Sequence, residues 1–170
     1  MSLLIPHKML ECWEGAVRVV RTIYLQVEET PQAKQSTQFG RGRSWTPKKK
    51  VEYIKRLSSS FSEQHNGSIL LGQLRLTVVY CFPWTAKQKP FRQLGWSFTD
   101  HTVDLDNLLK PLKDSLKGVV LRDDSQIVEV RTRKIRYVVG MLAVRIDEIL
   151  PNREWLQPVG HKPGKKIENF

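Results

Sequence analysis

Long apolar runs and cysteine are both scarce in this chain of 170 residues. Its apolar runs are far too short to cross a bilayer, which excludes a helical membrane protein. The first residues form a short apolar patch but lack the basic start and full apolar core of a signal peptide. Cys12 and Cys81, the only cysteines, lie far apart in apolar contexts, so we expect buried free thiols. The sequence therefore predicts a cytoplasmic protein without a disulfide framework or a Cys/His zinc site.

Several common functional motifs are also missing. The chain has no P-loop, no GxGxxG and no Ser/His/Asp set, and its four histidines are scattered, so no small-molecule cofactor is expected. Acidic residues are few as well, with 17 Asp and Glu against 28 Lys and Arg, a net charge of +11. Such a basic excess is typical of proteins that bind nucleic acid or another anionic surface. The alternative is a basic protein whose charge serves only solubility.

The length and the 40% hydrophobic content fit one globular domain that buries about 70% of its unfolded surface. We expect this domain at residues 16–150, between an N-terminal extension at 1–15 and a basic tail at 151–170. Runs rich in β-branched residues predict strands at 16–27, 70–82, 127–137 and 141–149, the last two forming a hairpin that turns around 138–140.

Helical spacing predicts two helices. The first begins near Pro47 behind Thr46 as N-cap, and the second covers residues 106–117 and stops at Gly118. Residues 31–46 and 83–103 are expected to be loops. The order β-α-β-α-β-β predicts an α+β fold with one mixed sheet and two helices packed on it.

Both helices are expected to be amphipathic. The first has an apolar face made of Val51, Ile54, Leu57 and Phe61. Its opposite face is basic, with Lys48, Lys49, Lys55 and Arg56. The second helix has an apolar face made of Leu108, Leu109, Leu112 and Leu116. Its other face is charged, with Asp106, Lys110, Lys113 and Lys117.

Four carboxylates and a lysine gather near the second helix of this basic chain. Asp104 and Asp106 are two residues apart, so an extended backbone points both carboxylates to one side. Asp106 is expected at the helix N-terminus, where backbone N–H groups and the helix dipole keep it ionised. Lys110 lies one turn further on the same side, although the following Pro111 predicts a kink or a late helix start.

This acid cluster predicts a divalent metal site. Mg²⁺ prefers hard oxygen ligands, and carboxylates that hold one or two such ions can bind a phosphodiester and activate a water for hydrolysis. Asp123 and Asp124, in a turn that leads into a strand, are the natural source of the third ligand. Taken singly, Asp106 could be only an N-cap and Asp123-Asp124 only a β-turn. An EF-hand loop is excluded because Leu108 and Leu109 occupy its fifth and sixth positions.

At these residues the chain resembles the RusA-type Holliday junction resolvases. The likeness rests on three stretches, Asp104-Leu-Asp106-Asn107-Leu-Leu-Lys110, Asp114-Ser-Leu-Lys-Gly118 and Asp123-Asp124-Ser-Gln126-Ile127. A weaker likeness upstream is Phe39-Gly-Arg-Gly-Arg-Ser-Trp-Thr-Pro47. Where the family often has Arg-Pro-Arg before its basic helix, this chain has Lys34-Gln-Ser-Thr-Gln38, so one DNA contact could be lost or moved.

The resemblance implies a homodimeric endonuclease, encoded by a bacterium or prophage, that requires Mg²⁺ or Mn²⁺ and resolves four-way DNA junctions in recombination and repair by paired nicks. It implies that Asp104, Asp106 and Asp124 are catalytic metal ligands and Lys110 is the lysine of the cleft. Asn107 and Asp123 are then supporting residues, and Asp123 could exchange roles with Asp124. Two alternatives stay open: a non-catalytic protein that binds branched DNA, and a related nuclease for other branched or single-stranded DNA.

Basic residues outside the cluster are candidates for binding DNA phosphates. The first group is Arg41, Arg43, Lys48, Lys49, Lys55 and Arg56. Two further groups are Lys87, Lys89 and Arg92, and Arg131, Arg133, Lys134 and Arg136. The aromatic residues between positions 84 and 98 are interpreted as core or dimer interface, or alternatively as stacking partners for exposed bases. The cleavage preference, the number of metal ions and the dimer surface stay open.

Overall fold

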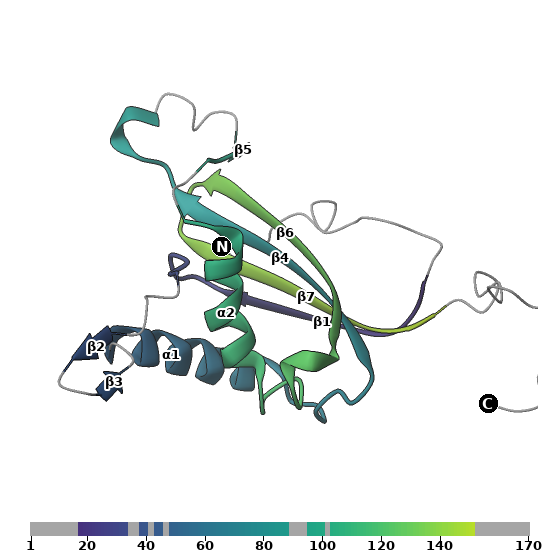
Figure 1. The fold of residues 1–170 in the computed structure, drawn as a ribbon. Helices are drawn as coiled ribbons and strands as arrows, with labels where there is room; N and C mark the ends of the chain where they lie inside the picture. The colour runs from purple at the N-terminus through teal and green to yellow at the C-terminus, as the bar shows by residue number, and fades with distance from the viewer. Residues whose placement is uncertain are drawn as a thin grey trace, which may run out of the picture.

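The computed structural model describes residues 17–33, 38–40, 43–45, 48–88, 95–100 and 103–151. Its centre is a five-stranded sheet in the order β1-β7-β4-β6-β5 (Figure 1). The strands are β1 Val17–Val27, β7 Met141–Pro151, β4 Gln73–Pro83, β6 Ile127–Tyr137 and β5 Ser97–Phe98. Only β4 and β6 pair in parallel, and the other neighbours are antiparallel. The predicted α+β fold with one mixed sheet is therefore confirmed.

The predicted hairpin of the last two long strands is wrong. β4 lies between β6 and β7 and pairs with both, so residues 138–140 connect two strands that are not neighbours. The connection must cross two strand spacings, about 10 Å. Four Cα–Cα steps of about 3.8 Å can span that distance. A loop of this length therefore fits both a hairpin and a crossing of β4.

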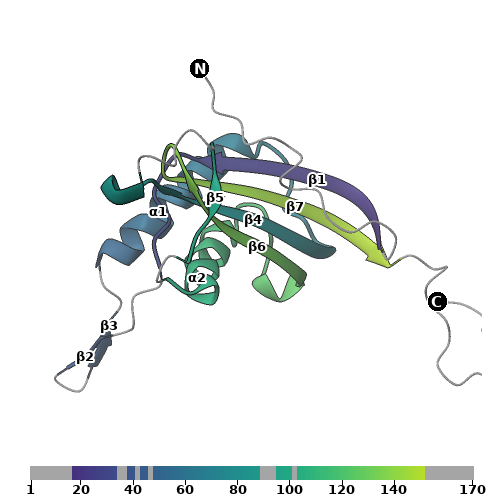
Figure 2. The same cartoon turned by 90° about the horizontal axis from the view of Figure 1, so that it is seen from above.

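Two helices pack on the same face of the sheet (Figures 1 and 2). They are α1 Lys48–Gln64 and α2 Leu105–Leu116. Their buried side chains join those of the central strands in one core that includes Tyr53, Leu57, Phe61, Leu108, Leu112, Leu116, Leu74, Leu76, Val78, Tyr80, Leu142, Val144 and Ile146. The Ser58 hydroxyl of α1 donates a 2.7 Å hydrogen bond to the Ser115 carbonyl of α2, which fixes the two helices against each other.

The buried face of α1 differs from its prediction, since Ile54 is only partly buried and Tyr53 takes the place of Val51. Tyr53 is buried, and its burial raises the pKa of the phenol to about 12, whereas Val51 is exposed. In α2 the predicted Leu109 is only partly buried, and Pro111 takes a place on the buried face. The helix begins at Leu105 and continues through Pro111, so a late start is excluded. Gly118 has a φ of 77° just after the helix, as expected of a residue that ends it.

Four short elements were not predicted. β2 Gln38–Gly40 and β3 Arg43–Trp45 form a two-stranded sheet within the expected loop before α1. The edge strand β5 lies within the expected loop 83–103. The fourth is η3 Asp124–Gln126, a turn of 3₁₀ helix that precedes β6. The proposed N-cap Thr46, with Pro47, lies outside the described residues. None of the described helices is long and apolar enough to cross a membrane.

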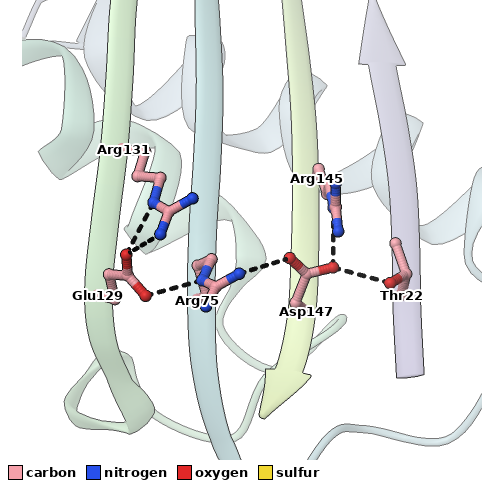
Figure 3. A network of polar contacts seen from close by, with 6 residues as sticks. All are labelled: Thr22, Arg75, Glu129, Arg131, Arg145 and Asp147. Carbon is pink, nitrogen blue, oxygen red and sulfur yellow. Dashed lines mark hydrogen bonds and ion pairs between the residues drawn. The ribbon is translucent and has the colours of Figure 1, made fainter. Parts of the chain in front are cut away.

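The face of the sheet opposite the helices carries a polar network (Figure 3). Arg75 donates a 2.7 Å hydrogen bond to Glu129 and lies 3.9 Å from the Asp147 carboxylate, which is 1% exposed. Asp147 also accepts 2.7–2.8 Å hydrogen bonds from Thr22 and Arg145. Because the contacts connect β6, β4, β7 and β1, they fix the register of the long strands.

The cysteines and the aromatic residues between positions 84 and 98 differ in how well they match the predictions. Cys81 is buried, as predicted, and burial raises the pKa of its thiol to about 12. Cys12 and Phe91 lie outside the described residues. Trp96 and Phe98 are exposed and pack edge to face with ring centroids 5.4 Å apart, so they are not part of the sheet core.

Candidate active site

The first acid-bearing segment is the start of α2. Asp104 is the N-cap residue, with an extended backbone and no hydrogen bond from its side chain to the helix. The helix begins one residue earlier than predicted, so the alternative that Asp106 is only the N-cap is wrong. Asp106 lies in the first turn. Both side chains are exposed, so both carboxylates are accessible from solvent.

Asp106 and Lys110 form the predicted pair on this exposed surface. The Lys110 ammonium donates a 2.9 Å hydrogen bond to Asp106 Oδ2, as expected of residues four apart on a helix. This hydrogen bond lowers the pKa of Asp106 below its ordinary value, with a smaller contribution from the backbone N–H groups of Asn107 and of Asp106 itself. The helix is continuous through Pro111, so the kink considered from the sequence does not separate this carboxylate from the ammonium.

The second acid-bearing segment is the turn that contains Asp123 and η3. Asp123 is the N-cap residue of η3, and its Oδ1 accepts a 3.1 Å hydrogen bond from the backbone N–H of Ser125. Its Oδ2 accepts a hydrogen bond from the Lys117 ammonium at the end of α2. The bond from Lys117, followed by that from Ser125, lowers the pKa of Asp123. Both carboxylate oxygens of Asp123 thus have partners within the protein.

Gln126 attaches this turn to the sheet. Its Oε1 accepts hydrogen bonds of 2.8 and 2.9 Å from the backbone N–H groups of Arg122 and Asp123. Its Nε2 donates hydrogen bonds of 2.9 and 3.1 Å to the carbonyls of Leu70 and Gly72, just before β4. The amide therefore uses both of its ends to hold the acidic turn, and a carboxylate could not supply the two donors.

Asp124 is held much more loosely than Asp123. Its carboxylate lies 3.7 Å from the Lys113 ammonium, and 49% of its side chain is exposed. Lys113 is on the same face of α2 as Lys110 and Lys117, because residues three and four apart lie one above the other on a helix. Three lysines of one helix face thus contact three of the carboxylates, namely Asp106, Asp124 and Asp123.

The structure does not bring the three predicted metal ligands together. Asp104 and Asp106 lie at the start of α2, whereas Asp124 contacts Lys113, about 10 Å further along the helix axis from Asp106. Within the described parts of the chain, no three His, Cys, Asp or Glu side chains gather closely enough to hold a metal ion. The lysine face of α2 lies between the two segments.

The chemistry of these side chains nevertheless fits a hard divalent cation. Asp104, Asp106 and Asp124 are exposed carboxylates, the ligands that Mg²⁺ prefers, and it binds through few of them while keeping several waters. The three carboxylates border one face of α2, and the contacts that hold Asp106 and Asp124 are exposed lysine pairs. Such exposed pairs are weak because water and salt screen them, so either carboxylate can exchange its partner at little cost.

The predicted DNA-binding residues occupy several environments. Lys48, Lys49 and Lys55 are exposed on α1, as the helical spacing predicted. Arg56 instead pairs with Glu29, at 2.5 Å, so part of its charge is neutralised within the protein. Arg41 lies outside the described residues, as does the side chain of Arg43.

The third predicted basic group, on β6, is largely engaged within the protein. Arg131 contacts Glu129, Lys134 donates a hydrogen bond to the Val103 carbonyl, and the buried Arg136 donates one to the Pro83 carbonyl. Arg133 also has a partner.

Two residues of this region were not predicted as functional. Lys113 was placed on the charged face of α2, but nothing in the sequence showed that Asp124 would be its neighbour. Gln126 was noticed only as part of a motif. For Lys113 a signal did exist, because its spacing of three residues from Lys110 and four from Lys117 repeats along one helix face. For Gln126 no local signal existed, since its carbonyl acceptors lie more than fifty residues away.

The comparison with protein families agrees with the residues of this surface. A family model described as endodeoxyribonuclease RusA matches residues 7–147, which include α2, η3 and every described strand except the end of β7. No curated protein matches the chain. The family indicates an endonuclease that resolves Holliday junctions, and it supports a nuclease activity for this chain. The chain therefore belongs to the RusA endodeoxyribonuclease family.

Proposed function

We propose that the protein is a Mg²⁺-dependent, homodimeric endonuclease that resolves four-way DNA junctions by paired symmetric nicks. Family membership supports the junction as substrate. Two active sites are required for paired nicks, and two copies of the chain supply them. The net charge of +11 supports binding to a polyanion of this kind.

The observation that carries the proposal is the exposed pair of Asp106 and Lys110 beside Asp104. A pure DNA-binding surface gains nothing from carboxylates, because they repel phosphate. A nuclease gains from them, since a carboxylate can hold a cation while a neighbouring ammonium contacts a phosphate oxygen. The 2.9 Å contact supports this proposal, because two groups so close together could both reach a single phosphodiester.

Asp104, Asp106 and Asp124 would hold the cation, which, when bound, activates a water and stabilises negative charge on the phosphate. Lys110 and Lys113 must release Asp106 and Asp124 when the cation binds. The turn that carries Asp124 must also come closer to the start of α2, because the three carboxylates are not gathered in the structure. Lys110 then donates to an oxygen of the scissile phosphate, where charge develops during hydrolysis. Asn107, whose backbone N–H helps to keep Asp106 ionised, is a supporting residue.

Asp123 is a positioning residue in this proposal. Both of its oxygens have partners in the protein, Lys117 and Ser125, and the turn depends on these hydrogen bonds. Asp124 is the freer neighbour and so the better third ligand. We therefore propose Asp124, rather than Asp123, as the third ligand.

DNA binding is assigned to the exposed lysines of α1. Lys48 and Lys55 are seven residues apart, so they lie on one side of the helix and can follow a phosphate backbone. Arg56 contributes less because Glu29 holds it. The Arg41 and Arg43 side chains are proposed as further contacts from the segment before α1.

Cleavage assays with three substrates test the proposal. The protein is incubated with a four-way junction, a fork and a linear duplex of the same sequences, each with and without Mg²⁺. We expect symmetric paired nicks in the junction only, and only with Mg²⁺. Cutting of the fork instead of the junction would replace the substrate assignment. If no substrate is cut under any condition, the enzymatic proposal is wrong.

A further inference from the structure

We propose that Lys113 is a second phosphate-contacting lysine of this site, held by Asp124 until a cation binds that carboxylate. This inference rests on the proposed function, since it assigns Asp124 to the cation. Its own basis is the stripe of lysines along α2. Lys110, Lys113 and Lys117 lie within two helical turns on one face, and each contacts a different carboxylate.

The contact between Lys113 and Asp124 is suited to exchange. The two charged groups are 3.7 Å apart, beyond the length of a good hydrogen bond. Lys113 is 31% exposed and Asp124 is 49% exposed, so water can replace either partner. Among the described residues, Lys113 is the only ion-pair partner of the Asp124 carboxylate, and the charge of Lys117 acts on it from a greater distance. A cation that binds Asp124 therefore needs to displace only the Lys113 ammonium.

The neighbouring contact between Lys117 and Asp123 is of the opposite kind. Asp123 also accepts a hydrogen bond from Ser125, and Gln126 holds its backbone N–H. The turn keeps these hydrogen bonds when Lys117 is replaced. Lys117 thus contacts a carboxylate that positions the turn, whereas Lys113 contacts one that can bind the cation. The two differ in role although they carry the same charge on the same helix face.

Once released, Lys113 would lie beside Lys110, on the surface proposed to bind the phosphodiester. It is three residues from Lys110 on the charged face, with the two acid-bearing segments at either end. An ammonium without its carboxylate is an electrostatic partner for the DNA backbone. Cation binding and DNA binding should then favour each other, because the cation converts an internally neutralised lysine into a free one. Such coupling is reciprocal between the two ligands.

The test compares Lys113→Gln with Lys117→Gln, which remove equal charge from the same helix face. Mn²⁺ binding to each protein is measured without DNA, by following the loss of the spectroscopic signal of unbound Mn²⁺ as the protein is added. Junction binding is measured by fluorescence anisotropy with and without Ca²⁺, at one salt concentration. A third variant, Lys113→Arg, keeps the charge. Circular dichroism shows whether each variant is folded.

We expect Lys113→Gln to bind Mn²⁺ about two- to fivefold more tightly, the range that an exposed ion pair can contribute. We expect the same variant to lose most of the Ca²⁺-induced gain in junction affinity. Lys117→Gln should change the Mn²⁺ affinity less than about twofold, because Lys117 acts on Asp124 only from a distance, where salt screens its charge. Lys113→Arg should behave as the wild type in both measurements.

Two outcomes would overturn the inference without touching the proposed function. One is an equal change of Mn²⁺ affinity in Lys113→Gln and Lys117→Gln, which would indicate a general effect of charge. The other is weaker Mn²⁺ binding by Lys113→Gln, which would mean that Lys113 positions Asp124 for the cation. Failure of the proposed function looks different, because the wild-type protein would then neither bind Mn²⁺ nor cut a junction with Mg²⁺.

Discussion

The two acid-bearing segments at the ends of α2 are held in opposite ways. At the start of the helix, the side-chain partner of Asp106 is Lys110, which is four residues away in the sequence. At the other end, the turn of Asp123 and Asp124 is fixed by Gln126, which reaches residues 70 and 72. One segment is local and exposed, and the other depends on the assembled sheet. The exposed pair at the start of α2 is therefore free to take part in the reaction, whereas the turn at the other end positions the proposed ligand Asp124.

The largest expected effect is at the local segment. Asp106→Asn should lower the rate of junction cleavage more than about 100-fold, beyond the loss for residues that only support a ligand. Junction binding should stay intact or become tighter, because a charge that repels phosphate is removed. Cleavage and anisotropy assays measure the two effects. Glu63→Gln, an exposed carboxylate on α1, is the control and should cut normally. Wild-type cleavage by Asp106→Asn would remove this residue from the active site.

The second prediction concerns the scaffold of the other segment. Gln126→Ala removes four hydrogen bonds and should lower the free energy of unfolding by about 2 kcal/mol, since each bond contributes roughly 0.5–1.5 kcal/mol. Urea denaturation measures this change. Gln73→Ala, an exposed glutamine at the start of β4, should have almost no effect. Equal stability of the two variants would show that the turn does not depend on Gln126.

The third prediction is a pH dependence specific to the turn. The pKa of Asp123 is lowered in the folded protein by Lys117 and Ser125. In the unfolded chain this carboxyl has a pKa of about 3.9, so as the pH falls the unfolded chain binds the proton before the folded protein does. The ionised carboxylate therefore stabilises the fold above that pH, and its contribution is lost as the pH falls further. Unfolding measured between pH 5 and pH 2, as rough limits, should therefore be less steeply pH-dependent in Asp123→Asn and in Lys117→Gln. Slopes identical to that of the wild type would contradict this account.

The smallest predicted effect tests whether DNA affinity comes from outside both segments. Replacing Lys48 or Lys55 with Gln should weaken binding to junctions of every sequence alike. Each replacement should also make the slope of log K against log salt concentration shallower by about 1. Arg56→Gln should reduce the slope less, since Glu29 already neutralises part of its charge. Anisotropy titrations at several salt concentrations measure the slopes. Unchanged slopes for both lysines would exclude α1 as a phosphate-binding surface.

The difference between the two segments also explains what the sequence could predict. The pair of Asp106 and Lys110 and the buried leucines of α2 follow from helical spacing, and the long strands follow from runs rich in β-branched residues. The position of β4 between β6 and β7 does not, because a short connection suits a neighbouring strand as well as the next one. Tyr53 replaces Val51 in the core because the helix is rotated relative to the sheet, which only tertiary packing decides. The partners of Asp123, Asp124 and Gln126 likewise depend on contacts between distant parts of the chain.

The central claim is that the two segments serve one cation. A double-mutant cycle on Mn²⁺ affinity tests it most directly, with Asp106→Asn, Asp124→Asn and the double variant. If both carboxylates hold the same cation, each single variant should bind Mn²⁺ weakly, and the double variant should lose little more. If the losses multiply independently, or if Asp124→Asn binds Mn²⁺ like the wild type, the two segments do not form a single site.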